Sequence, residues 1–127
     1  MNTIEVGLVG IATVRVSDAN TAKTMKSGAL EVFATPAMCA LMEEAACAAL
    51  VGKLEANFGT VGTKLTITHD APSALGADIV AKAEVISVDN RRISYKVMAY
   101  DGDKVIGQGT HERFIINNEK FMAKLGK

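Results

Sequence analysis

The chain has 127 residues, of which 49% are hydrophobic, and its 14 Lys and Arg residues balance 14 Asp and Glu residues. This length predicts one domain, residues 1–127, whose core can form without a disulfide or a metal. The zero net charge and the lack of any long run of one sign give no support for a nucleic-acid partner or for a polybasic membrane contact.

The two cysteines, Cys39 and Cys47, lie in one apolar segment and are interpreted as small buried hydrophobic residues. Eight residues of helix would separate them by about 12 Å, too far for a disulfide with each other. Their use favours a reducing compartment, and no N-terminal stretch has the pattern of a secretion signal. Glu43 and Glu44 at the centre of the apolar segment argue against membrane insertion. The sequence therefore predicts a soluble cytoplasmic protein.

The first half of the chain predicts a strand, a long connection and a helix. Residues 4–16 are β-branched and partly alternating, which indicates a strand. Residues 17–31 are polar and irregular, and a connection of this length is usually functional. The helix is expected to start at Thr35 as the N-cap, with Pro36 at the first helical position, and to end near residue 57. Residues 36–52 show no polar face, so this helix should be buried all round.

The second half of the chain changes to a period of two residues. Four strands are predicted, at 62–71, 78–88, 92–100 and 104–116. Short turn-like separators at 89–90 and 101–103 are typical of hairpins, so the last three strands should be antiparallel neighbours. Residues 117–127 are expected to form a short amphipathic helix.

This order of elements predicts an α+β protein with a hotdog fold. In that fold, a curved antiparallel sheet of about five strands is wrapped around one long buried helix. A five-stranded sheet would leave one side of the helix and one sheet edge open, and a second copy of the chain would close both. We therefore expect a homodimer.

Two carboxylates in an apolar helix point to possible chemistry, because a buried carboxylate is costly unless something pairs with it or uses it. Thr35, Cys39, Glu43 and Cys47 are spaced by four and should lie along one stripe of the helix. Glu44 points about 100° away from Glu43, so the stripe favours Glu43. The alternative, in which both carboxylates are solvated where the helix emerges from the sheet, remains open.

The two histidines, His69 and His111, each lie in a predicted strand, where a lone histidine is more often structural or on the surface. No residues have metal-ligand spacing, and no phosphate-binding loop or nucleophile-elbow motif is present. We therefore predict no metal and no other cofactor. A hydroxyl, a carboxylate and an imidazole would suit acyl transfer, since they can orient, attack or activate water, and move protons. Spacing alone does not show that these groups meet.

A set of short motifs runs in order from about Val32 to about Leu125. The motifs are Val32-Phe33-Ala34-Thr35, Leu41-Met42-Glu43, Ala46-Cys47, Gly62-Thr63 before Thr68-His69, Arg91-Arg92-Ile93-Ser94, Gly107-Gln108-Gly109-Thr110-His111-Glu112-Arg113 and Glu119-Lys120-Phe121. In order and spacing this set resembles the fluoroacetyl-CoA thioesterase family of hotdog proteins. The resemblance covers roughly three quarters of the chain, whereas residues 4–16 match only in character.

The resemblance implies a homodimeric hydrolase of acyl-CoA thioesters that needs no metal and has its active sites at the dimer interface. It implies that Thr35, Glu43 and His69 are the catalytic residues, and that Gly62 lines the acyl site. Glu43 would act as nucleophile or as general base on water, and His69 would assist proton transfer and stabilise charge. Thr35 would hold the carboxylate and the substrate by hydrogen bonds.

The resemblance also bears on substrate binding. It implies that Phe33 and Ala29 belong to the substrate site, and that Arg113 lies beside the reacting groups or faces a phosphate of CoA. Family members selective for fluoroacetyl-CoA carry an aromatic lid residue where this chain has Ala29, and a small residue cannot form the same hydrophobic gate. We therefore predict a thioesterase for short or medium acyl-CoA without fluoroacetyl selectivity. His111 is shared with the family, but the resemblance gives it no role.

Two other functions are compatible with a hotdog fold. The first is a module that binds acyl-CoA or an acyl-carrier thioester without hydrolysing it. The second is a hydratase or dehydratase, which would pair a histidine with an acid on the helix. The predicted helix has no histidine, so the sequence favours the thioesterase over this last class.

Overall fold

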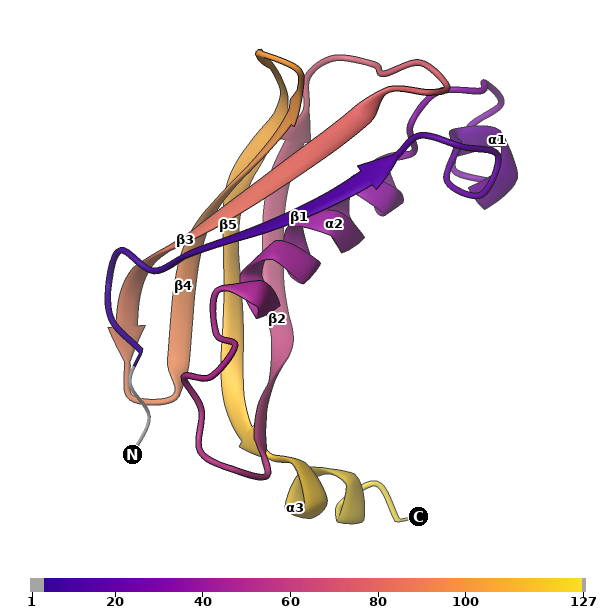
Figure 1. Ribbon diagram of the computed structural model, residues 1–127. Helices are drawn as coiled ribbons and strands as arrows, with labels where there is room; N and C mark the ends of the chain where they lie inside the picture. Colours follow the sequence, from indigo (N-terminus) through magenta and orange to yellow (C-terminus); the bar gives the residue numbers. More distant parts are fainter. Residues whose placement is uncertain (1–3, 127) are drawn as a thin grey trace.

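The computed structural model describes residues 4–126. In chain order the elements are β1 (Val9–Arg15), α1 (Ala22–Met25), α2 (Thr35–Ala48), β2 (Phe58–His69), β3 (Asp78–Asp89), β4 (Arg92–Asp101), β5 (Lys104–Asn117) and α3 (Asn118–Ala123). The strands form one five-stranded antiparallel sheet in the order β1-β3-β4-β5-β2. Figure 1 shows the long helix α2 lying across this sheet, which is the predicted hotdog arrangement.

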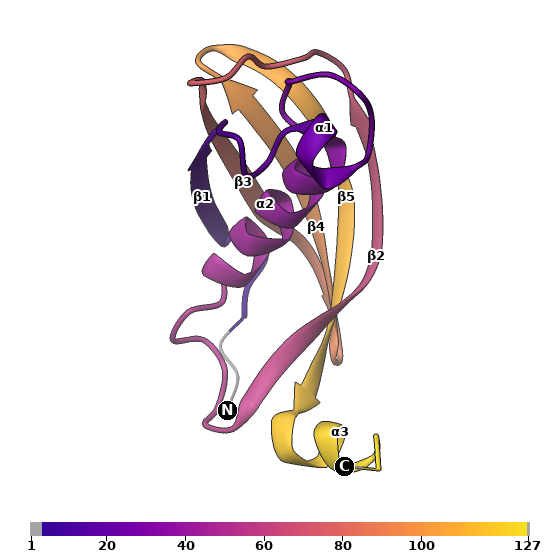
Figure 2. The same ribbon diagram turned by 90° about the vertical axis from the view of Figure 1, so that its right-hand side faces the viewer.

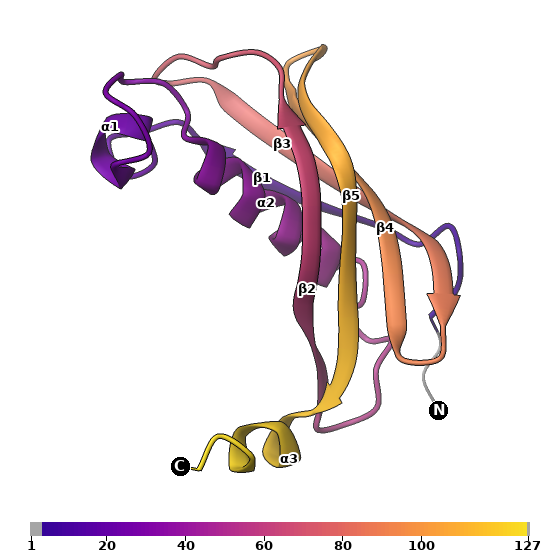
Figure 3. The same cartoon turned by 180° about the vertical axis from the view of Figure 1, so that it is seen from behind.

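The sheet curves around α2, as the view from the side shows (Figure 2). The two predicted hairpins are present, with Asp89 paired to Arg92 at one turn and Asp101 paired to Lys104 at the other. Strand β1 joins the sheet next to β3, and β2 joins it next to β5, so these two strands form the edges (Figure 3). Among residues 4–126, no helix is long and apolar enough to cross a membrane.

Several element boundaries differ from the sequence predictions. The first strand begins at Val9 rather than at residue 4, because the amide of Leu8 turns back to the carbonyl of Glu5. Strand β2 runs from residue 58 to residue 69 instead of 62–71. The connection at 17–31 contains the short helix α1, whose start is capped by the hydroxyl of Thr21. These shifts leave the order of elements as predicted.

Helix α2 starts and ends differently from the prediction. Thr35 is its first helical residue, and the N-cap is Ala34, which has no side-chain cap hydrogen bond. The Thr35 hydroxyl bonds His69 instead, so the predicted N-cap was wrong. The helix ends at Ala48, well before residue 57. There the chain tightens into turns and reaches Gly52 with a φ of +75°, a backbone conformation that stops a right-handed helix.

Only one side of α2 is buried in the described chain. The buried side consists of apolar residues, namely Met38, Leu41, Met42, Ala45 and Ala46. The other side is open, and the exposed residues of the helix are Thr35, Pro36, Ala40, Glu44, Cys47 and Ala48. One sheet thus covers only one flank of the helix, as expected for a single copy, and burial all round stays a prediction that depends on a second copy. The interpretation of both cysteines as buried was wrong, since Cys39 is half-buried and Cys47 is exposed.

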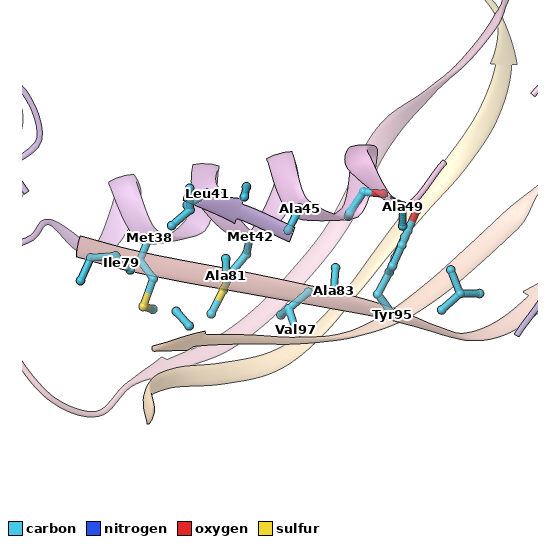
Figure 4. Close-up of a cluster of buried hydrophobic side chains, with 14 of the residues drawn as sticks. Met38, Leu41, Met42, Ala45, Ala49, Ile79, Ala81, Ala83, Tyr95 and Val97 are labelled. Carbon is cyan, nitrogen blue, oxygen red and sulfur yellow. Dashed lines mark hydrogen bonds between the residues drawn. The ribbon is translucent and has the colours of Figure 1, made fainter. Parts of the chain in front are cut away.

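The buried side of α2 packs against the middle strands of the sheet. Figure 4 shows its side chains facing Ile79, Ala81 and Ala83 of β3 together with Tyr95 and Val97 of β4. Strand β1 approaches the helix backbone itself, since a Cβ on Gly10 would overlap the Ala45 carbonyl oxygen and lie 2.9 Å from the Ala49 Cα. The fold thus holds α2 by side-chain packing on β3 and β4 and by backbone contact on β1.

Candidate active site

Thr35 and His69 meet where helix α2 begins and strand β2 ends. The Thr35 Oγ1 atom lies 2.7 Å from the His69 Nδ1 atom, a hydrogen bond between the first residue of α2 and the last residue of β2. A pocket of about 250 Å³ opens beside them, and its lining residues are Ala22, Ser27, Val32, Phe33, Thr35, His69, Asp70, Ala71 and Pro72. Phe33 is buried at 1% exposure. The predicted site residues Thr35, His69 and Phe33 are therefore brought together.

His69 has one ring nitrogen in use and one without a partner. Its Nε2 atom is buried and has no hydrogen-bond partner within residues 4–126. Burial is the largest cause acting on the ring and lowers the pKa of His69, while Asp70 and the Ala71 backbone act in the opposite direction. A depressed pKa keeps the imidazole neutral near pH 7. A neutral ring with an unpaired nitrogen can transfer a proton.

Glu43 lies elsewhere on the same helix and faces Arg113 of strand β5. Its Oε2 atom is 3.8 Å from the Arg113 Nη1 atom, and the two side chains are 43% and 9% exposed. Arg113 is fixed from the other direction by Thr60, whose hydroxyl accepts from Nε at 2.9 Å and whose carbonyl accepts from Nη2 at 3.2 Å. Glu43 is thus a half-exposed carboxylate beside a buried, tightly held cation. Glu44 is exposed, which agrees with the preference for Glu43 over Glu44.

Gly62 of strand β2 packs against the Glu43 end of the helix. A Cβ at this position would lie 2.8 Å from the Glu43 Oε2 atom and 3.2 Å from the Arg113 Nη1 atom. The same Cβ would lie 3.3 Å from the His111 Cε1 atom. The missing side chain therefore leaves the space that the carboxylate and the guanidinium occupy.

The three predicted catalytic residues do not form one cluster within a single copy: Thr35 and His69 are in contact, and Glu43 lies apart from them. Thr35 and Glu43 are eight residues apart on α2, which corresponds to about 12 Å along the helix axis. Thr35 contacts His69, whereas Glu43 contacts Arg113. Both contacts lie between α2 and β2 or its neighbour β5, on the flank of α2 that carries the predicted stripe.

Ala29 lies outside the pocket, whereas Thr60 holds Arg113 in the site. Ala29 is exposed on the connection before α2 and does not line the pocket beside Thr35 and His69. Thr60 was missed by the sequence reasoning, although it holds Arg113. The available signal was alternation along β2, which puts residue 60 on the same face as Gly62. Residues 4–126 contain no group of three or more His, Cys, Asp or Glu side chains arranged to hold a metal ion.

Comparison with known proteins decides the family. A sequence model of the fluoroacetyl-CoA-specific thioesterases matches residues 16–119. The fluoroacetyl-CoA thioesterase of Streptantibioticus cattleyicolor is 46% identical over 95 residues, which cover 75% of this chain and 68% of that protein. The chain belongs to the fluoroacetyl-CoA thioesterase family. The resemblance seen in the sequence motifs is thereby confirmed, and the protein is a thioester hydrolase.

Solved structures support the same assignment. The fluoroacetyl-CoA thioesterase FlK superposes with a TM-score of 0.91 at 37% identity, covering 98% of this chain and 96% of that one. A phenylalanine-to-alanine mutant of FlK in complex with fluoroacetate and CoA superposes with a TM-score of 0.87 at 38% identity, covering 93% and 99%. A thioesterase superfamily member from Thermus thermophilus shares the fold, with a TM-score of 0.89 at 24% identity and coverage of 98% and 93%. These matches confirm the predicted hotdog fold for this fluoroacetyl-CoA thioesterase family member.

Proposed function

We propose that this protein hydrolyses short or medium acyl-CoA thioesters to the free acid and CoA, using Glu43, His69 and Thr35. The observation that carries the proposal is the hydrogen bond of 2.7 Å between Thr35 and His69, which lies beside a pocket. Thr35 belongs to the helix that also carries Glu43. The proposal is supported by the family of the chain. We assign the reaction to the cytoplasm, as the sequence predicts.

The chemistry has two routes that share the same residues. In one route, the Glu43 carboxylate attacks the thioester carbonyl carbon, the C–S bond breaks, and water then hydrolyses the resulting anhydride. In the other, Glu43 takes a proton from water, and the water oxygen attacks the carbonyl carbon. In the first route CoA leaves as the thiolate and is neutralised by the proton released when water attacks the anhydride. In the second, the C–S bond breaks after the attack of water, and the proton that Glu43 has taken goes to the CoA sulfur, with His69 as the proposed carrier. The Thr35 hydroxyl and the positive end of α2 suit the negative charge that develops on the carbonyl oxygen.

We also propose that the protein is a homodimer whose active sites lie at the interface. Two features support this: the open flank of α2, and the outer edge of β2, which pairs with no strand within residues 4–126. A two-fold copy on this flank could bring Glu43 of one copy toward Thr35 and His69 of the other. That arrangement would remove the separation of about 12 Å along the helix between the two parts of the site.

Mixing two inactive variants tests the shared site. We would unfold, mix and refold Glu43→Gln with His69→Ala, and measure CoA thiol release against each variant refolded alone. If Glu43 and His69 of different copies form one site, each mixed dimer contains one intact site, and about a quarter of wild-type activity returns. If both residues act within one copy, no activity returns, and the interface model fails. Sedimentation of the refolded samples checks that dimers have formed.

The catalytic assignment is tested by Glu43→Gln, with Glu44→Gln as the matched control. We expect thiol release to fall by about 10³-fold or more for Glu43→Gln, since its amide can neither attack nor take a proton. Glu44→Gln should stay close to wild type, because Glu44 points about 100° away from Glu43 around the helix. Full turnover by folded Glu43→Gln would contradict the role of Glu43. A thermal shift with CoA esters but no thiol release from the wild type would instead identify a binding module.

Substrate choice is tested by a thiol-release screen over acyl-CoA of increasing chain length, including acetyl-CoA and fluoroacetyl-CoA. Because Ala29 is small and exposed, we expect the kcat/KM values for fluoroacetyl-CoA and acetyl-CoA to agree within about ten-fold. Across the series of chain lengths, we expect the highest kcat/KM at a short or medium acyl chain. Ala29→Phe should move that balance toward fluoroacetyl-CoA. A strong preference of the wild type for fluoroacetyl-CoA would show that this protein selects by another means.

A further inference from the structure

His111 is a buried histidine that the proposed reaction does not use. It lies on strand β5, is 1% exposed, and has both ring nitrogens in hydrogen bonds. Its Nδ1 atom is 2.7 Å from the carbonyl oxygen of Lys64, and a carbonyl can only accept, so Nδ1 carries the hydrogen. In the neutral ring, Nε2 is then an acceptor, and it receives a hydrogen bond from the Arg113 Nη1 atom at 3.2 Å.

We propose that His111 is a positioning residue, a neutral acceptor that holds Arg113 against Glu43 and so sets the place of the catalytic carboxylate. The inference rests on the proposed catalytic role of Glu43. His111 does not line the pocket beside Thr35, and its two ring nitrogens bond Lys64 and Arg113. It acts through Arg113.

The contacts of Arg113 show why one more acceptor matters. Its Nε and Nη2 atoms both donate to Thr60, which fixes one side of the planar guanidinium. The remaining Nη1 atom has the His111 ring at 3.2 Å and the Glu43 carboxylate at 3.8 Å. Without the acceptor on His111, this arm loses its closest partner. The guanidinium could then tilt, and the Glu43 carboxylate would lose the fixed charge beside it.

The electrostatics favour a neutral ring. The groups that act on His111 are Arg113 on its own strand, Glu43 on α2, the neighbouring Glu112 and the Lys64 carbonyl on β2. Burial is the largest cause and lowers the pKa of His111, and Arg113 lowers it further, while the carbonyl and the two carboxylates act to raise it. A protonated ring would place a second positive charge beside Arg113, and its Nε2 atom could no longer accept the hydrogen bond from Nη1. A lowered pKa therefore keeps the acceptor in place near pH 7.

Tyr95 connects this network back to the helix that carries Glu43. Its ring stacks on the His111 ring, with centroids 5.8 Å apart and planes at 26°. Its hydroxyl donates to the Ala46 carbonyl of α2 at 3.1 Å, one turn beyond Glu43. His111 is thus packed between the cation that faces Glu43 and the side chain that ties α2 to the sheet.

Two amide variants separate a positioning role from a structural one. In His111→Asn, the short amide can still donate to Lys64 but cannot reach Arg113. In His111→Gln, the longer amide can place its oxygen where Nε2 was. We expect His111→Asn to lower kcat by about 10²-fold, the cost of misplacing a catalytic group by about an ångström, with KM changed by about two-fold or less. His111→Gln should stay within about five-fold of wild type.

A double-mutant cycle supplies the second readout. If His111 acts through Arg113, then adding His111→Asn to Arg113→Gln should lower kcat by no more than about two-fold beyond Arg113→Gln alone. Val97→Ala, a buried change on β4 at a position that pairs with Gly109 and not with His111 or Arg113, is the control for lost stability and should leave kcat near wild type. In the wild-type protein, nitrogen NMR of the His111 ring should show a neutral ring protonated on Nδ1 at about pH 7.

The possible results distinguish this inference from the proposed function. If Glu43→Gln retains turnover, the proposed function fails. Two results with an inactive Glu43→Gln would contradict the positioning role alone. The first is an equal loss of kcat in His111→Asn and His111→Gln, and the second is a double mutant in which the kcat losses of His111→Asn and Arg113→Gln multiply. If the His111 variants do not fold, the NMR measurement decides, since a charged His111 at about pH 7 overturns the inference.

Discussion

The two parts of the candidate site, one at Thr35 and one at Glu43, are built in opposite ways. At the Thr35 end, the Thr35 hydroxyl bonds the His69 ring, a pocket opens beside them, and the buried Nε2 atom of His69 has no partner in the described part of the chain. At the Glu43 end, Arg113 is held by Thr60 and His111, and the missing side chain of Gly62 leaves room for the carboxylate. The first end leaves a ring nitrogen available for proton transfer, whereas the second holds the reacting carboxylate beside a fixed cation.

This difference suggests a division of labour within one small domain. Proton transfer needs a group with a free position and a pKa near the working pH. Electrostatic catalysis needs groups that do not move when charge develops. A single rigid network would serve only the second need, so the separation along α2 has a chemical reason. The following variants test this division, from the largest expected effect to the smallest.

His69→Ala should have the largest effect at the open end. Loss of the imidazole removes the proposed proton carrier, and we expect kcat to fall by about 10² to 10⁴-fold. The stability should change little, because the ring is only half-buried. Thiol release at saturating acyl-CoA measures the first quantity and urea unfolding the second. An active, folded His69→Ala would assign proton transfer to another group.

Thr35→Val should have a smaller effect and tests the hydroxyl directly. Valine keeps the shape of threonine but leaves the His69 Nδ1 atom unpaired, so we expect kcat to fall by about 10 to 100-fold. Thr35→Ser, which keeps the hydroxyl, is the matched control and should retain most of the activity. Equal losses in both variants would show that the methyl group, and not the hydroxyl, matters.

Gly62→Ala tests the packed end by filling its space. The added Cβ would come within 2.8 Å of the Glu43 Oε2 atom and displace the carboxylate, so we expect kcat to fall by about ten-fold. Gly59→Ala on the same strand is the control, because the atoms nearest its added Cβ belong to the Asn118 side chain and not to Glu43. If Gly62→Ala is as active as Gly59→Ala, the carboxylate is not held as tightly as we infer.

The smallest effect concerns stability at acid pH. The pKa values of His69 and His111 are both lowered in the folded chain, so the unfolded chain binds more protons below about pH 6.5. The contribution of these residues to the free energy of unfolding is therefore intact above about pH 6.5 and is lost as the pH falls. Urea unfolding at about pH 7 and about pH 5 should show a shallower loss for His111→Gln than for wild type. An identical loss would mean that His111 does not stay neutral in the fold.

The sequence was sufficient for the fold and for one part of the site. The change from a period of 3.6 to 2 separated the helix from the strands, and short turns identified both hairpins. Spacing by four on α2 favoured Glu43 over Glu44, and Glu43 is the carboxylate that has an arginine partner. These features are local, since each depends on residues a few positions apart.

The missed features depend on contacts between distant residues. The apolar run continues through the buried residues Ala49 and Leu50, so composition did not show that the helix stops at Ala48. The Thr35 hydroxyl was expected to cap the helix because the competing partner, His69, lies 34 positions away. Thr60 and Arg113 are 53 positions apart and meet only through the pairing of β2 with β5.

The contact of Gly10 with the backbone of α2 has a consequence for how this protein can diversify. Because no side-chain layer lies between β1 and the turn of helix at Ala45 and Ala49, a larger residue at position 10 cannot be absorbed by a change of rotamer. Substitution there would move the whole helix, and with it both Thr35 and Glu43. The segment 17–31, in contrast, is mostly exposed, and it contributes Ala22 and Ser27 to the pocket beside Thr35. That segment can therefore change with little effect on the packing of α2, whereas position 10 cannot.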